Sequence, residues 1–204
     1  MRTPELSPPE RAAIGLALAL LVLQAVAPGD ALEYRRAVLA PEPWRALTGH
    51  LIHINWSHAL INAAALWVVA RLYAPDLCAT RQATALVVSA LMISAALAWL
   101  YPAMQWYRGL SGALHGLFFA GAAKWLLSEH RRGLRRLWLP AALLVGGWAK
   151  VVFEQPDTGA LPHAAWLGAA VVPQAHLVGA ACGSVLGALF AATKARAREQ
   201  RDEQ

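Results

Sequence analysis

Six long apolar stretches constrain this chain more than any other feature of its sequence. A helix needs about 20 mostly apolar residues to cross the hydrocarbon core of a bilayer. Only 15% of the 204 residues are charged and the mean hydropathy is +0.41, which is too apolar for an ordinary soluble domain. The sequence therefore predicts an all-α membrane protein, a bundle of six transmembrane helices. The predicted spans are Ala12–Pro28, Leu51–Ala70, Ala83–Tyr101, Leu110–Leu127, Leu137–Phe153 and Trp166–Thr193.

The charged segments between these spans are too short for a separate soluble domain. We expect a cytoplasmic N-terminus over residues 1–11, one membrane domain over residues 12–193 and a charged cytoplasmic tail over residues 194–204. With the N-terminus inside, the cytoplasmic segments hold 13 Lys and Arg residues and the outer loops hold 4. Because positive loops stay on the cytoplasmic side, the predicted topology is N-in and C-in. Topology thus explains the net charge of +6, and we expect no nucleic-acid partner.

Strongly polar side chains inside the spans are the candidate functional residues, because such groups are costly in hydrocarbon. In the predicted topology the second, fourth and sixth spans enter the membrane from the outer side. His58 then lies roughly 12 Å and His176 roughly 15 Å into its span, and the short fourth span starts Ser111 below the outer surface. We therefore expect these three residues at one depth. The full set is His50, His53, His58, Asn62, Ser111, His115, Lys150, Glu154 and His176.

Glycines are predicted to bring the serine and the histidine together. Gly109 and Gly112 flank Ser111 at a loop-to-helix junction, where they free the backbone and leave amide N–H groups at the positive helix end. In the sixth span a stripe of small residues about 60° wide lies below His176, and such stripes let a neighbouring helix approach closely. The packing glycines of this stripe are Gly179, Gly183 and Gly187.

This arrangement predicts acyl-transfer chemistry. A serine hydroxyl becomes a useful nucleophile when a neighbouring base removes its proton, so Ser111 is the candidate nucleophile and His176 the candidate base. His176 would then protonate the leaving amine. His58, the Asn62 amide and the Ser111 backbone N–H are candidate donors to the oxyanion. The second, fourth and sixth spans carry no carboxylate at this depth, so we expect a Ser–His dyad and no triad.

Three further residues leave alternatives open. His115 lies one turn below Ser111 on the same face, so it is the alternative base, a support for the site or a contact for the substrate. Lys150 and Glu154 are spaced i,i+4 and are expected to neutralise each other inside the bundle. Glu154 lies near the outer end of its span, where it is also a candidate for binding a substrate group.

The sequence indicates neither a metal nor a cofactor. His50 and His53 lie more than about 100° from His58 on a continuous helix, so we expect interfacial or loop-anchoring roles for them and no three-histidine metal cluster. A zinc protease would need an H-E-x-x-H run on a helix, which the chain lacks. The four aspartates fall in predicted loops or in the tail, which excludes a pair of aspartates within the membrane.

The pattern resembles the rhomboid family of intramembrane serine proteases. The matching elements are His58-x-x-x-Asn62, Gly109-Leu-Ser111-Gly112, Ala175-His176-x-x-Gly179-x-x-x-Gly183 and the loop pair Trp44-Arg45. Within the family the chain looks most like the rhombosortase branch, in its compact length and in WRALTGHLIHINWSHALIN, GLSGALHG and KVVFEQ. This resemblance implies a rhomboid-like bundle in a bacterial inner membrane. It also implies cleavage, at the periplasmic face, of membrane-anchored proteins that end in a GlyGly-CTERM transmembrane tail.

Two other classes of function were weighed against the protease. A catalytically inactive rhomboid-like protein that binds membrane clients is the main alternative, but such proteins usually lack the serine or the histidine, and this chain has both. A transporter would also place polar residues at the midplane, yet the sequence shows no paired broken helices and no inverted repeat. The particular substrates and the oligomeric state stay open.

Overall fold

Helices form most of the molecule. The computed structural model describes residues 5–27, 29–130, 137–155 and 172–202. The long helices are α1 (Pro8–Val26), α4 (Trp56–Tyr73), α5 (Ala79–Trp99), α6 (Ser111–His130), α7 (Trp138–Phe153) and α9 (Pro173–Asp202). The short elements are α2 (Gly29–Leu32), β1 (Tyr34–Arg35), the 3-10 helix η1 (Arg36–Val38), α3 (Arg45–Thr48) and β2 (Trp106–Tyr107).

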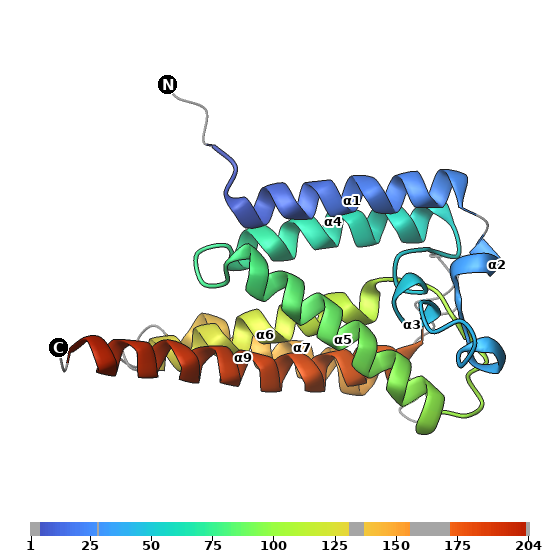
Figure 1. Ribbon diagram of the computed structural model, residues 1–204. Coiled ribbons are helices and arrows are strands. Elements are labelled where there is room, and N and C mark those ends of the chain that lie inside the picture. Colours follow the sequence, from blue (N-terminus) through green and yellow to red (C-terminus); the bar gives the residue numbers. More distant parts are fainter. Residues whose placement is uncertain (1–4, 28, 131–136, 156–171, 203–204) are drawn as a thin grey trace.

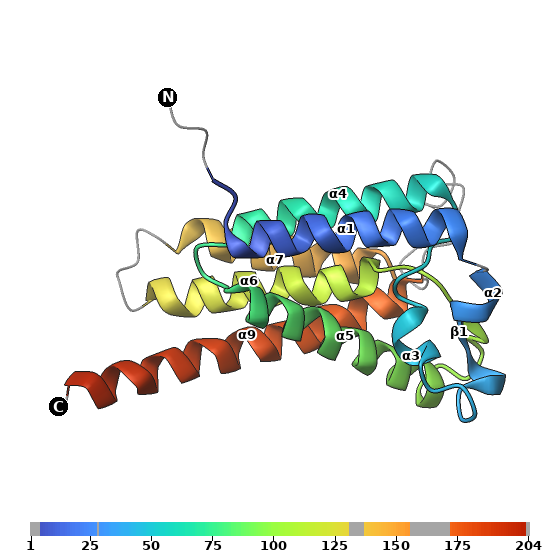
Figure 2. The same ribbon diagram turned by 45° about the horizontal axis from the view of Figure 1, so that its top comes forward.

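Helix α6 lies at the centre of the bundle. It packs against α4, α5, α7 and α9, while α1 lies beside α4 (Figures 1 and 2). Small and apolar residues such as Ala113, Leu117 and Phe119 are fully buried along α6. The short elements α2, α3 and β1 gather at one end of the bundle, and α1 begins and α9 ends at the other (Figure 1).

The long helices follow the six predicted apolar stretches, with shifts at their ends. Helix α4 begins later than the predicted start at Leu51, because the Asn55 side chain accepts a hydrogen bond from the His58 backbone N–H at 2.8 Å and caps the helix at Trp56. Helix α9 continues to Asp202, so the segment predicted as a charged tail is helical up to that residue. The predicted sixth span before residue 172 lies outside the described residues.

Three of the long helices are long and apolar enough to cross a membrane. They are α1, α5 and the Pro173–Thr193 part of α9, and α7 is a shorter apolar helix. The candidate polar residues lie on α4, α6, α7 and α9 and in the segments next to α4 and α7. The structure therefore supports a helical membrane protein with polar groups inside the bundle.

The segment immediately before α6 is held in place by contacts with the segment between α1 and α4. Strands β1 and β2 pair antiparallel, with Tyr34 opposite Tyr107, and the Arg108 guanidinium donates to Glu33 at 2.7 Å. The Gly109 N–H donates to the Gly49 carbonyl at 3.0 Å. These contacts fix the backbone immediately before Ser111, the first residue of α6.

The Arg45 side chain anchors the same connecting segment. It is buried and donates to the carbonyls of Asp30 at 2.8 Å and Glu33 at 3.0 Å, and it pairs with Glu42. Its neighbour Trp44 is about half exposed. Arg45 thus has the loop-anchoring position that the sequence suggested for the Trp-Arg pair.

Candidate active site

Backbone geometry at Gly109 presents Ser111 at the start of α6. Gly109 has a φ of 128°, which L side chains rarely adopt, and it is the sole residue with positive φ in the described ranges. A Cβ at this position would also lie 2.7 Å from the His58 imidazole. Glycine here therefore permits both the turn into α6 and the close approach of the His58 ring.

The glycine stripe of α9 lies directly on α6. A Cβ on Gly179 would collide with the Gly112 carbonyl oxygen, and one on Gly183 would collide with that of Gly116. The two backbones are therefore in direct contact over two turns. Because His176 is one turn before Gly179, this contact places its imidazole beside the first turn of α6.

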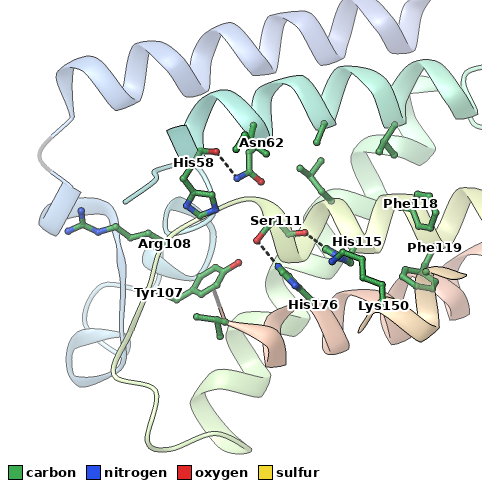
Figure 3. A pocket seen from close by; sticks show the side chains of 16 residues that line it. His58, Asn62, Tyr107, Arg108, Ser111, His115, Phe118, Phe119, Lys150 and His176 are labelled. Atoms are coloured by element: carbon green, nitrogen blue, oxygen red, sulfur yellow. Dashed lines mark hydrogen bonds between the residues drawn. The ribbon is translucent and has the colours of Figure 1, made fainter. Parts of the chain in front are cut away.

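Ser111 and His176 are hydrogen-bonded to each other. Their Oγ and Nε2 atoms are 3.0 Å apart, and a dashed line marks this hydrogen bond in Figure 3. His176 is buried and Ser111 is partly exposed to a pocket. A distance of 3.0 Å is within the reach at which a base can take a hydroxyl proton.

His115 stacks against this pair, and neither of its ring nitrogens contacts the Ser111 hydroxyl. Its ring stacks on the His176 ring with centroids 4.1 Å apart and an interplanar angle of 17°. Its Nδ1 is 2.8 Å from the Ser111 backbone oxygen, and its Nε2 is 3.2 Å from the Lys150 ammonium. This geometry fits a support for the His176 ring better than a base for the Ser111 hydroxyl.

A carboxylate also reaches His176, which corrects the expectation that none would. Glu154 Oε2 lies 3.1 Å from His176 Nδ1, and Glu154 Oε1 lies 2.7 Å from Lys150 Nζ. Glu154 is not on the second, fourth or sixth span, on which the expectation rested, because it follows the last residue of α7. The i,i+4 pair with Lys150 is present as expected, but it uses one of the two carboxylate oxygens.

The same cluster has the residue types of a metal site. Ligand atoms of His115, Glu154 and His176 lie within 4.8 Å of one another. However, the Lys150 ammonium already contacts both the Glu154 carboxylate and the His115 ring. A fixed positive charge at this point opposes a second cation, so we interpret the cluster as a hydrogen-bond network.

His58 and Asn62 face the pocket from α4. The Asn62 amide donates to the His58 backbone carbonyl at 2.8 Å, and both side chains line the pocket together with Ser111 (Figure 3). The second amide hydrogen of Asn62 remains for another acceptor. These positions are compatible with contacts to a substrate carbonyl at Ser111.

His53 lies much closer to His58 than the helical-wheel estimate implied. Its ring meets the His58 ring edge-on with centroids 5.0 Å apart. The estimate was wrong because His50 and His53 precede the cap of α4 and so are not on that helix. Both are buried, and His53 Nε2 accepts from the Leu110 N–H at 3.5 Å. Their burial is compatible with the loop-anchoring alternative.

Tyr107 is a pocket residue that was not predicted from the sequence. This residue is buried, lines the pocket, and its hydroxyl points toward Ser111 (Figure 3). Burial raises its pKa to about 12, so the hydroxyl stays protonated and can act as a donor. Only the pairing of β1 with β2 places it here, and two-residue strands leave no periodic signal in a sequence.

The pocket has a volume of about 410 Å³ and lies between α4, α6 and α7. Its walls are mainly apolar, with Ile61, Val69 and Phe118 among them, and the polar groups gather at the Ser111 end. An apolar cavity with polar groups beside the serine suits a peptide segment that is itself apolar.

The fold and this geometry define a class: a helical membrane protein in which a serine and a histidine are hydrogen-bonded beside an apolar pocket. Comparison with known families agrees, because the family model described as Rhomboid domain matches residues 40–193. The chain therefore belongs to the rhomboid family, whose members are generally intramembrane serine proteases that act on membrane proteins. A search of curated proteins finds no match to the sequence.

Proposed function

We propose that this protein is an intramembrane serine endopeptidase with Ser111 as nucleophile and His176 as general base. The observation that carries the proposal is the 3.0 Å contact between Ser111 Oγ and His176 Nε2 at the polar end of an apolar pocket. An inactive client-binding rhomboid would have no need of this contact. The family match supports the same reaction class.

The reaction follows from the positions of these groups. The Ser111 oxygen attacks the scissile carbonyl while His176 Nε2 takes the hydroxyl proton. The tetrahedral intermediate then expels the amine, which receives that proton from His176, and leaves an acyl group on Ser111. A water molecule, deprotonated by His176, attacks the acyl group and returns the free serine.

The oxyanion would form at the positive end of α6. The Ser111 backbone N–H lies at this helix start, and the Asn62 amide and the His58 ring face the same pocket. Donors placed in advance around a developing negative charge usually contribute several kcal/mol to catalysis. Gly109 and Gly112 support them by allowing the turn and the close contact with α9.

For the membrane arrangement we propose six spanning helices with both termini in the cytoplasm of a bacterium and the site facing the periplasm. Residues 1–11 would be the cytoplasmic N-terminus, residues 12–193 the membrane domain, and residues 194–204 the cytoplasmic end of α9. The excess of Lys and Arg on one side supports this orientation. So does the start of α1 at the same end of the bundle as the end of α9 (Figure 1).

For the substrate we propose exported proteins with a C-terminal transmembrane tail of the GlyGly-CTERM type, as in the rhombosortase branch. The motifs GLSGALHG and KVVFEQ support this branch. The apolar walls of the pocket suit small and apolar residues near the cleaved bond.

The test is cleavage of a tailed reporter by the purified protein in proteoliposomes. We expect wild type to cleave this reporter faster than a generic rhomboid substrate. Ser111→Ala and His176→Ala should each lower the rate at least about 1,000-fold at unchanged protein level. Equal cleavage of both reporters would contradict the proposed specificity for the tail but not the protease activity. Cleavage by Ser111→Ala would contradict the proposed protease activity itself.

A further inference from the structure

Glu154 occupies a position with two defined partners. One carboxylate oxygen is 3.1 Å from His176 Nδ1 and the other is 2.7 Å from Lys150 Nζ. The Glu154 side chain is 11% exposed and that of His176 is 6% exposed, whereas that of Lys150 is 52% exposed. The contact with the imidazole is thus the more protected of the two.

This contact determines which nitrogen of His176 carries the proton. A carboxylate only accepts hydrogen bonds, so Nδ1 must donate to it, and Nε2 is left with its lone pair toward the Ser111 hydroxyl. That is the tautomer a general base needs. The neighbouring ring has the same order: His115 Nδ1 faces a carbonyl oxygen, and His115 Nε2 faces the Lys150 ammonium, which only donates.

We propose that Glu154 is a positioning residue that holds His176 in the base-competent tautomer, so that Ser111, His176 and Glu154 act as a triad. The inference rests on the proposed protease function and deepens it. In serine hydrolases of other folds the same contact orients the imidazole and stabilises the imidazolium that forms during attack. Here the carboxylate comes from the end of α7, while serine and histidine come from α6 and α9.

Lys150 gives the proposal a specific consequence. In Glu154→Gln, the ammonium of Lys150, which only donates, favours the amide oxygen over the amide NH₂ group as its neighbour. The NH₂ group then faces His176 Nδ1 and forces the proton onto Nε2, where it blocks proton transfer from Ser111. If Lys150 is also removed, the amide can rotate and present its oxygen to Nδ1. The double variant should therefore be more active than the single one.

The experiment measures kcat and KM on the tailed reporter, and the rate at which a fluorophosphonate labels Ser111. We expect Glu154→Gln to lower kcat by about 10²- to 10⁴-fold with KM within twofold. Lys150→Met should lower kcat about threefold, and Lys150→Met/Glu154→Gln should recover at least tenfold over Glu154→Gln. Glu154→Asp, which keeps a carboxylate, should retain more activity than Glu154→Gln. Val145→Ala, on the exposed face of α7, is the matched control.

The outcomes separate the inference from the proposed function. Suppose that wild type cleaves the reporter and is labelled at Ser111, and that both rates in Glu154→Gln are within threefold of wild type. Glu154 is then not part of a triad, while the proposed protease function stands. A double variant no more active than Glu154→Gln would equally contradict the tautomer argument, because a purely structural ion pair predicts no recovery. If wild type is no more active than Ser111→Ala, the proposed function itself fails. Thermal unfolding of each variant in detergent checks that the fold is retained.

Discussion

The two sides of α6 are built in opposite ways. Toward α9 the helix backbones touch, since Gly179 and Gly183 leave no space for a Cβ against the carbonyls of α6. Toward α4 and α7 the same helix borders a pocket of about 410 Å³. The serine lies at the boundary between them. A tightly packed side can hold Ser111 and His176 in register while the open side admits a substrate, so rigidity and access come from different faces of one helix.

The largest effect is expected from adding one methyl group to the side of α6 that packs on α9. In Gly179→Ala the new Cβ meets the Gly112 carbonyl, so α6 and α9 must separate. We expect a loss of about 2–3 kcal/mol in the free energy of unfolding and at least a 100-fold loss of activity, because small displacements of reacting groups are costly. Thermal unfolding in detergent and reporter cleavage measure both effects.

Gly146→Ala is the matched control for that variant. Nothing lies within 4 Å of a Cβ at this position on α7, and alanine favours a helix over glycine by up to about 1 kcal/mol. Unchanged or slightly raised stability is expected. Equal losses in the two variants would show that close packing of α6 on α9 is not special.

A buried histidine that contacts α5 gives a smaller effect that depends on pH. His50 lies before α4, and its Nε2 is 3.1 Å from the Ser94 hydroxyl of α5. Burial lowers its pKa from 6.5 to about 4. Because the folded protein disfavours the charged ring, the contribution of His50 to stability is constant above about pH 6.5 and falls as pH drops toward 4. The total loss is at most about 3 kcal/mol.

Unfolding midpoints measured between pH 4 and pH 8 in wild type and His50→Gln test this prediction. The variant lacks the titrating ring, so the part of the pH dependence that His50 contributes should disappear. A wild-type curve with the same slope as that of the variant would contradict the assignment.

A larger side chain in the pocket between α4, α6 and α7 should slow cleavage of the substrate with little change in the fold. Val69 lines the pocket from α4, whereas its neighbour Val68 is exposed on the outer face of the bundle. In Val69→Trp we expect kcat/KM for the tailed reporter to fall about tenfold, because the new ring occupies space needed by the peptide. Labelling of Ser111 by a small fluorophosphonate should stay within twofold of wild type.

Val68→Trp adds the same ring to an exposed position about 100° away on α4 and should leave both measurements unchanged. If the two tryptophan variants behave alike, the pocket between α4 and α7 does not receive the substrate.

The two sides also differ in how well the sequence predicts them. The glycine stripe with His176 repeats along one helix, so helical geometry alone placed it against Ser111. The apolar stretches likewise gave the helices, apart from their ends. By contrast, Glu154 and Tyr107 reach the site through the orientation of α7 and through a pairing between strands about 70 residues apart. The local spacing of Glu154 indicates only its pair with Lys150, and Tyr107 has no local signal. The cap at Asn55 moved the start of α4, so positions estimated for His50 and His53 on that helix did not apply.

Activation of the Ser111 hydroxyl by His176 within the folded bundle is tested most directly by fluorophosphonate labelling of the purified protein in detergent. Mass spectrometry locates the adduct. We expect the adduct on Ser111 in wild type, and at least a 100-fold slower reaction in folded His176→Ala. An adduct on another residue, or labelling of His176→Ala at the wild-type rate, would contradict the claim.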